Sequence, residues 1–168
     1  MRKGKNKLIL LLLSFLCCSF FVQSQNRNEQ YKTDTLSFNK KRMIIAVPLN
    51  SIKYQQGYEE GSFVTYTIQT DSVVITVHYG SMVSKPFIQN SNCVILNDLN
   101  INKGKYTINK RIGYSTKIDN NSFFKQIGYF REDSYKGYSI TVMYENASKS
   151  QVSKYDSILD KVQIETVE

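Results

Sequence analysis

The sequence predicts an α+β fold, an antiparallel sheet of about six strands with a C-terminal amphipathic helix packed on one face. The first supporting observation is an alternation of apolar and polar residues from position 105 to 118, with Lys110 and Thr116 as exceptions, which places Tyr106, Ile108 and Ile112 on one side. Successive side chains of a strand point to opposite faces, so this segment is expected to have one face in a core and one in water.

The second observation is a change of period near the C-terminus. Apolar residues recur there at helical spacing, namely Val152, Tyr155, Leu159 and Val162, with Ile158 beside them. Such a stripe is typical of an amphipathic helix laid on a sheet. Ser148 or Ser150 is expected to cap its start. Four charged residues are expected to point away from the sheet: Lys154, Asp156, Asp160 and Lys161.

The remaining elements follow from β-rich runs separated by polar turns. A hairpin joined through Thr70-Asp71 is the clearest of them. Strands are expected at 42–48, 62–69, 72–79, 93–96, 123–131 and 138–145, with turns at 119–122 and 132–137. The polar stretch 50–61 is expected to be a loop or a short helix.

The first residues predict export. A basic start without acids precedes the apolar run Leu8–Val22. The predicted signal-peptidase cleavage lies between Ser24 and Gln25, with small or short residues at the −3 and −1 positions. Residues 1–24 are therefore expected to be a cleaved signal peptide, leaving a periplasmic or extracellular protein without a membrane span. An uncleaved N-terminal anchor and a lipoprotein, for which Cys17 and Cys18 lie in the run, are the alternatives.

Beyond the signal, residues 25–34 are expected to form a flexible polar leader and residues 35–168 a single α+β domain. The whole chain carries a formal net charge of +8, but four of its 22 Lys and Arg residues lie in the signal peptide. The remaining charge is too modest to indicate a nucleic-acid partner. Only Cys93 remains after cleavage, so no internal disulfide is expected, and its apolar setting predicts a buried structural thiol.

No catalytic, cofactor-binding or metal-binding residues are predicted. His78 is the only histidine, lies on the more polar face of a strand, and has no local nucleophile or orienting acid beside it. Glu59-Glu60 and Glu132-Asp133 are adjacent pairs that are expected in solvated turns.

Three tripeptides, Asp34-Thr35-Leu36, Asp71-Ser72-Val73 and Asp156-Ser157-Ile158, resemble the sites that some Bacteroidetes O-glycosylate on exported proteins. The Lys/Asn/Ile-rich composition suits that phylum. Chance and ordinary turn chemistry are the alternative explanation.

The order of elements, closing with the helix and tail from Tyr155 to Ile164, resembles the Mog1/PsbP-like α/β sandwich proteins over residues 35–165. This resemblance implies an α/β sandwich fold for the chain, and the family has no catalytic residues to carry over.

These observations favour a non-enzymatic exported binding or interaction protein, with a protein or an envelope component as its partner. A periplasmic immunity or inhibitor protein that blocks a toxin or hydrolase is the alternative, and a hydrolase with an unrecognised site is the second alternative. The candidate interaction residues are Tyr54, Tyr58, Lys105 and Arg111. The sequence leaves the ligand and the oligomeric state open.

Overall fold

The computed structural model describes residues 30–80, 93–115 and 128–167. Residues 31–168 form one compact unit. The predicted signal peptide and its cleavage site at Ser24 and Gln25 lie outside the described residues, so they stay predictions. Within the described ranges, no helix has the length and apolar character that crossing a bilayer requires.

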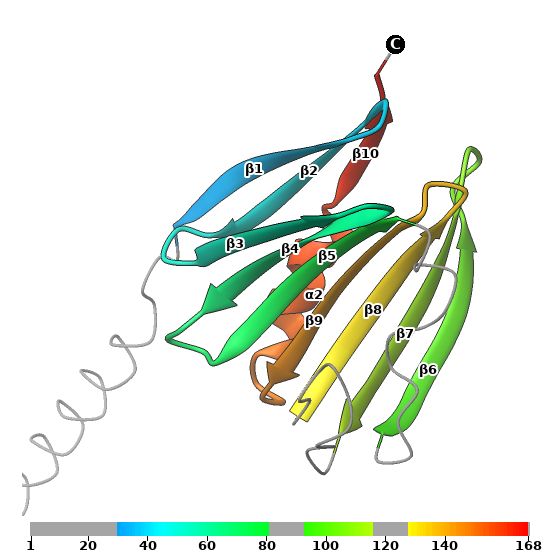
Figure 1. Cartoon of the computed structure of the whole chain (residues 1–168). Coiled ribbons are helices and arrows are strands. Elements are labelled where there is room, and N and C mark those ends of the chain that lie inside the picture. The colour runs from blue at the N-terminus through cyan, green and yellow to red at the C-terminus, as the bar shows by residue number, and fades with distance from the viewer. Residues whose placement is uncertain (1–29, 81–92, 116–127, 168) are drawn as a thin grey trace, which may run out of the picture. The chain divides into compact units, whose positions relative to one another are not determined.

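The described residues of this unit form two antiparallel sheets and one helix (Figure 1). The larger sheet has seven strands in the order β3-β4-β5-β9-β8-β7-β6, and the smaller has three in the order β1-β2-β10. The larger contains β3 (Ile52–Tyr58), β4 (Gly61–Ile68), β5 (Val73–Gly80), β6 (Cys93–Asn102), β7 (Thr107–Ser115), β8 (Gly128–Lys136) and β9 (Ile140–Ala147). The smaller contains β1 (Tyr31–Phe38), β2 (Lys41–Pro48) and β10 (Gln163–Thr166), and the helix is α2 (Val152–Asp160).

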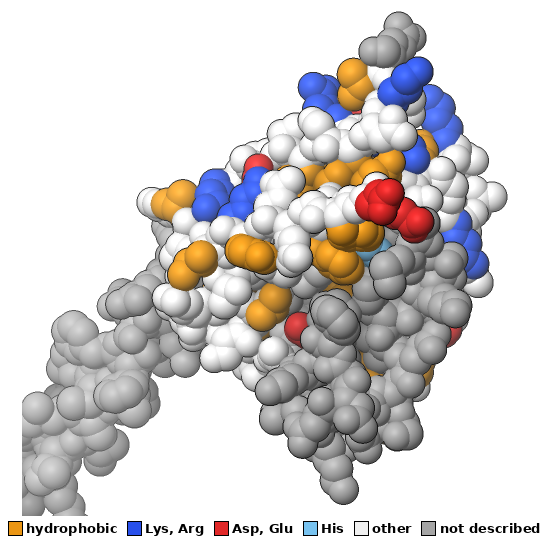
Figure 2. All heavy atoms as spheres, in the orientation of Figure 1, with side chains coloured by type: hydrophobic (Ala, Val, Ile, Leu, Met, Phe, Trp, Pro, Cys, Tyr) orange, Lys and Arg blue, Asp and Glu red, His pale blue; other side chains and the backbone are white. Residues whose placement is uncertain are grey.

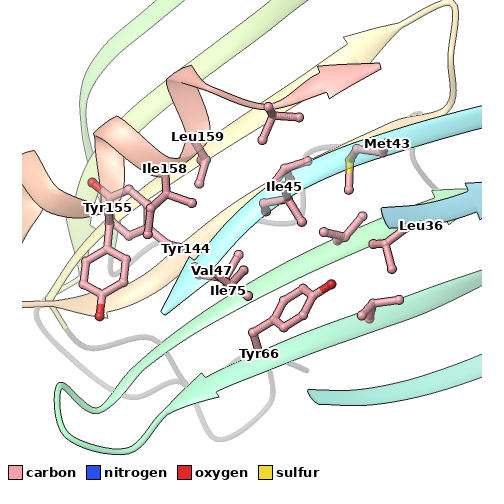
Figure 3. Close-up of a cluster of buried hydrophobic side chains, with 14 of the residues drawn as sticks. Leu36, Met43, Ile45, Val47, Tyr66, Ile75, Tyr144, Tyr155, Ile158 and Leu159 are labelled. Carbon is pink, nitrogen blue, oxygen red and sulfur yellow. The ribbon is translucent and has the colours of Figure 1, made fainter. Parts of the chain in front are cut away.

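The main core lies where one face of the seven-stranded sheet meets the three-stranded sheet and α2 (Figure 3). Alternate residues of β2, Met43, Ile45 and Val47, are fully buried there, as the period of a half-buried strand requires. They pack with Ile75 and Tyr144 of the larger sheet. The predicted α+β class is therefore confirmed, but the expectation of about six strands in one sheet is wrong.

Strand β1 begins inside the segment 25–34 that the sequence assigns to a flexible leader. Tyr31 pairs with Pro48, and the ladder continues to Phe38 opposite Lys41. Residues 31–34 belong to this ladder because Leu36 and Phe38 anchor β1 in the core, at 4% and 5% exposure.

Both edge strands of the larger sheet differ from expectation. The segment expected as a loop or short helix contains β3, and the short strand expected at 93–96 continues to Asn102. Each strand has one neighbour and is exposed on both faces over most of its length. Because neither face of these strands is buried along its length, many of their side chains are polar, and much of each segment resembles a loop in sequence.

Strand β8 runs through the segment expected as the turn 132–137, and the chain turns at Gly137 instead. Glu132 and Asp133 are each only 1% exposed, so they are not solvated turn residues. Asp133 is held in the strand because the guanidinium of Arg131, two residues earlier on the same face, binds it. The predicted turn 119–122 lies outside the described residues.

The C-terminal helix forms where the sequence predicts it, with Tyr155, Ile158 and Leu159 buried. Its N-cap is Gln151 and not a serine, and the Gln151 side chain accepts a hydrogen bond from the backbone N–H of Ser148 at 2.8 Å. The expectation that Lys154, Asp156 and Asp160 point away is wrong, because all three bind side chains of the sheet or its turns.

Candidate binding surfaces and the buried polar face

The face of the seven-stranded sheet opposite α2, called the polar face here, carries an unusual set of buried polar side chains. Each of them is at most 6% exposed: Thr76, His78, Ser115, Glu132, Thr141 and Glu145. Strand pairing fixes their positions, since His78 lies opposite Thr141 and Thr76 lies opposite Met143. Burial of so many polar groups is costly unless they are hydrogen-bonded, so this face is a candidate for a specific role.

His78 is enclosed by aromatic side chains of the neighbouring strands. Its ring stacks on Phe63 at 4.1 Å between centroids and 7° between planes. The hydroxyl of Tyr58 contacts His78 Nε2 and lies 3.2 Å from the carbonyl oxygen of Tyr79. A hydroxyl has one proton, so both contacts are satisfied when Nε2–H donates to Tyr58 and Tyr58 donates to Tyr79.

Burial lowers the pKa of His78 to about 4, because a charged imidazolium loses its hydration in this setting. Burial and the charge of Glu60 raise the pKa of the Tyr58 hydroxyl. The pair is therefore neutral at neutral pH.

The buried carboxylate of Glu132 belongs to a different part of the polar face. Ser134 Oγ donates to Glu132 Oε1 at 3.3 Å and lies 3.1 Å from the hydroxyl of Thr141. Strand β9 separates Glu132 on β8 from His78 on β5. Two strand spacings of about 4.8 Å each put their backbones about 10 Å apart, so His78 has Thr141 and not a carboxylate as its neighbour on β9.

On the opposite face, a buried arginine ties the sheet to the helix. Arg131, 2% exposed, donates to both carboxylate oxygens of Asp133 at 2.8 and 2.6 Å, to Asp160 Oδ1 at 2.7 Å and to the backbone oxygen of Asp156 at 3.1 Å. Tyr144 also donates to Asp156 Oδ1 at 3.0 Å. These bonds occupy the guanidinium with structural partners.

The pKa values of this network follow from burial and charge. Burial raises the pKa of Asp133 in spite of the opposing effect of Arg131. For Asp160, burial acts to raise the pKa, but the hydrogen bonds and charges of Arg131 and Lys110 outweigh it and the pKa is lowered. The pKa of Arg131 is raised because its carboxylate partners outweigh the effect of burial.

The edge of the sheet at β3 exposes an apolar patch, called the β3 edge patch here, that consists of Leu49, Ile52 and Tyr54. Their exposed fractions are 51%, 53% and 62%. Ile52 and Tyr54 share one face of the strand because they are two residues apart. Figure 2 shows hydrophobic side chains at the surface over β3. Within the described ranges β3 pairs only with β4, so its outer backbone edge faces solvent.

The four predicted interaction residues do not form one site. Tyr54 is exposed on β3, whereas Tyr58 on the same strand turns toward His78. Lys105 is exposed in the turn between β6 and β7, and Arg111 lies on the polar face with its Nε 3.4 Å from Asp98.

Cys93 is partly buried and packs against Phe130 and Met143.

An open hollow of about 640 Å³ lies along the outer side of α2. The residues that line it are Tyr129, Lys149, Val152, Ser153, Asp156, Ser157, Asp160 and Lys161.

The hydroxyl residues of the three Asp-Ser/Thr tripeptides, Thr35, Ser72 and Ser157, are all exposed. Whether they are modified stays a prediction.

Sequence reasoning missed Arg131 and Asp133. Their spacing of two residues on one strand face, between Tyr129 and Tyr135, was the available signal for a paired charge facing the helix.

Comparisons with family profiles, with curated proteins and with solved structures find no match to the chain. Among the described residues, no group of three His, Cys, Asp or Glu side chains is arranged to hold a metal ion.

Proposed function

We propose that the chain is an exported, non-enzymatic binding protein that holds an extended segment of a partner protein against β3. The observation that supports this function is the β3 edge patch beside a free strand edge. A partner strand added there gains backbone hydrogen bonds from the edge and side-chain contacts from Ile52 and Tyr54. Tyrosine is among the residues most often central to a protein interface.

The polar chemistry of the described residues supports binding rather than catalysis. Arg131, Asp133, Asp156 and Asp160 are engaged in one structural network. A toxin or a hydrolase blocked by this protein, as in the immunity alternative, is one partner that the same surface would accept.

A hydrolase is the second candidate, because His78, Glu132 and Glu145 lie buried on one face of the sheet. We rank it lower for two reasons. The residue opposite His78 on β9 is Thr141 and not a carboxylate, and a pKa of about 4 makes His78 a weak general base at neutral pH.

Photo-crosslinking in cells that express the full chain tests the proposed function. A photoreactive residue at Tyr54 is expected to label one exported partner, and Ile52→Lys is expected to abolish that adduct. The mass of the exported protein shows in the same experiment whether residues 1–24 are removed.

The labelled partner then allows an affinity measurement. Tyr54→Ala should weaken its binding on the order of tenfold or more, since a central aromatic side chain contributes at least about 1.4 kcal/mol. Tyr31→Ala is the matched control, because Tyr31 is a 45% exposed tyrosine on an edge strand of the other sheet. Equal labelling from positions 31 and 54, or equal affinities of the two variants, would contradict the proposal.

A further inference from the structure

The opposite edge of the seven-stranded sheet, at β6, is long, and no described strand other than β7 pairs with it. Ten residues from Cys93 to Asn102 form the strand, and every one from Val94 to Asn100 is exposed. Natural edges are normally guarded by lysine, proline or inward-pointing charges. This strand contains no lysine, arginine or proline and a single acid, Asp98.

A register shift between Ile95 and Asn97 interrupts the first part of the strand, so the regular part is 97–102. Pairing with β7 sorts its side chains by face. Leu99 lies opposite Lys110 and Ile101 opposite Ile108, on the side of α2, while the polar face receives Asp98, Asn100 and Asn102. The exposed edge is therefore apolar on one face and polar on the other.

The free backbone groups of this edge belong to the polar residues. The N–H of Lys103 donates to Tyr106 across the hairpin at 2.9 Å. Residues of the same parity, Ile101 and Leu99, direct their N–H and C=O groups toward β7, because these directions alternate along an antiparallel strand. Asp98, Asn100 and Asn102 consequently direct theirs to the free edge.

The arrangement of apolar and polar side chains along β6 is complementary to the same strand of a second copy in antiparallel orientation. Directly opposed residues of two antiparallel strands share a face, so a second copy can align only in registers that keep the faces matched. With Asn100 opposite Asn100, Leu99 meets Ile101 on the apolar face and Asp98 meets Asn102 on the polar face. The register with Asp98 opposite Asp98 brings like charges together and is disfavoured.

We propose that the chain forms a two-fold symmetric dimer in which β6 pairs with β6 of a second copy, centred on Asn100. The two seven-stranded sheets then form one continuous antiparallel sheet. Salt bridging between Asp98 and Arg111 within each copy offsets the one charge of the strand, so no net repulsion opposes the pairing. This surface is separate from the β3 edge patch, which stays free in the dimer.

Sedimentation of the protein purified from cells that express the full chain tests the dimer. The mass is expected to rise from one chain to two as the concentration is increased. Leu99→Lys should hold the mass at one chain, because the new charge faces Ile101 of the second copy. Ile52→Lys, which places the same charge on the exposed β3 edge, should leave the dimer intact.

Asn100→Pro is the second variant. Proline is tolerated on an edge strand where the backbone N–H faces solvent, so the variant should fold and remain a single chain. Its circular dichroism spectrum should match the parent's. A parent that sediments as one chain at every concentration, or a Leu99→Lys or Asn100→Pro variant that sediments as two chains, would overturn the proposal.

Cysteine cross-linking tests the register. In a Cys93→Ser background, Asn100→Cys should form a disulfide-linked dimer under mild oxidation, because opposed residues have Cα atoms about 5.5 Å apart, within disulfide range. Asn97→Cys, far from its own copy in this register, should not. Equal cross-linking at both positions would contradict pairing centred on Asn100.

Discussion

At the scale of single residues, buried charge is what most distinguishes this protein from a simple apolar sandwich. Arg131 and Asp133 have side chains that are each 2% exposed, and the arginine reaches Asp156 and Asp160 of the helix. A buried ion pair is costly to desolvate, so its value depends on complete hydrogen bonding. The bidentate contact with Asp133 supplies that bonding here.

Removing the buried arginine should therefore be far more damaging than removing an exposed one. Arg131→Met leaves Asp133 buried without its cation and should lower the free energy of unfolding by about 3–5 kcal/mol. Arg42→Met breaks an ion pair with Glu165 in which both side chains are 44–50% exposed, and should cost less than about 1 kcal/mol. Urea denaturation of both variants measures the difference, and similar midpoints would contradict a structural role for Arg131.

His78 should make the stability depend on pH. Its pKa is about 4 in the folded protein and about 6.5 when unfolded, so below pH 6.5 the unfolded chain takes up the proton first. The free energy of unfolding should therefore fall as the pH is lowered, by about 2 kcal/mol between pH 7.5 and pH 5.

His78→Gln cannot titrate in this window, so its unfolding free energy should change less over the same pH range. The carboxylates of Asp34, Asp71 and Asp160 do not account for the pH dependence expected from His78. Burial opposes the ionised form of each, but their hydrogen bonds and cationic partners prevail and lower the pKa below the ordinary value for aspartate. Parallel pH profiles for His78→Gln and the parent would refute the assignment.

At the scale of elements, α2 is a short helix that depends on the sheet. It has nine residues, and an isolated helix of that length is marginal in water. Its apolar stripe faces the core, while Lys154 and Tyr155 also donate to Asp71 in the β4–β5 turn at 2.6 and 2.7 Å. The helix therefore connects the hairpin turn to the buried arginine network.

Leu159, 1% exposed, is the residue whose truncation tests this dependence. Leu159→Ala should lower the free energy of unfolding by about 2–5 kcal/mol through lost burial and a residual cavity. Ser153→Ala, an exposed substitution on the same helix, should change it by no more than about 0.5 kcal/mol. Denaturation midpoints that agree for the Leu159→Ala variant and the parent would show that the helix contributes little.

At the scale of the whole folded unit, polar contacts fix how its layers meet. Tyr66 of the larger sheet donates to Asp34 of the smaller sheet at 2.8 Å, and Lys53 lies 2.8 Å from the same carboxylate. Hydrophobic burial between the layers is non-directional, whereas these hydrogen bonds require a particular alignment. Among the described strands, β3 and β6 are the two edges of the larger sheet, and the proposed partner and dimer contacts depend on them.

The sequence by itself determined the elements whose pattern is local. The apolar run 43–47 predicted β2, Thr70-Asp71 predicted the hairpin turn, and the stripe of Tyr155 and Leu159 predicted the helix. An apolar run, a turn sequence and a helical stripe are each formed by residues close together in the chain, so neighbouring residues are sufficient. Of the four predicted interaction residues, only Tyr54 lies in the surface proposed to bind a partner.

Only the tertiary structure decided the extent of the edge strands and the burial of charged residues. Edge strands β3 and β6 lack a buried face, so the sequence predicted a loop or short helix at β3 and only the first residues of β6, and pairing with β4 and β7 shows the full strands. Glu132 and Asp133 resembled a solvated turn because charge normally indicates exposure, yet both are buried in β8, Asp133 against Arg131 and Glu132 on the polar face. The energy of a buried charge depends on partners brought from elsewhere in the chain, and no local pattern records those partners.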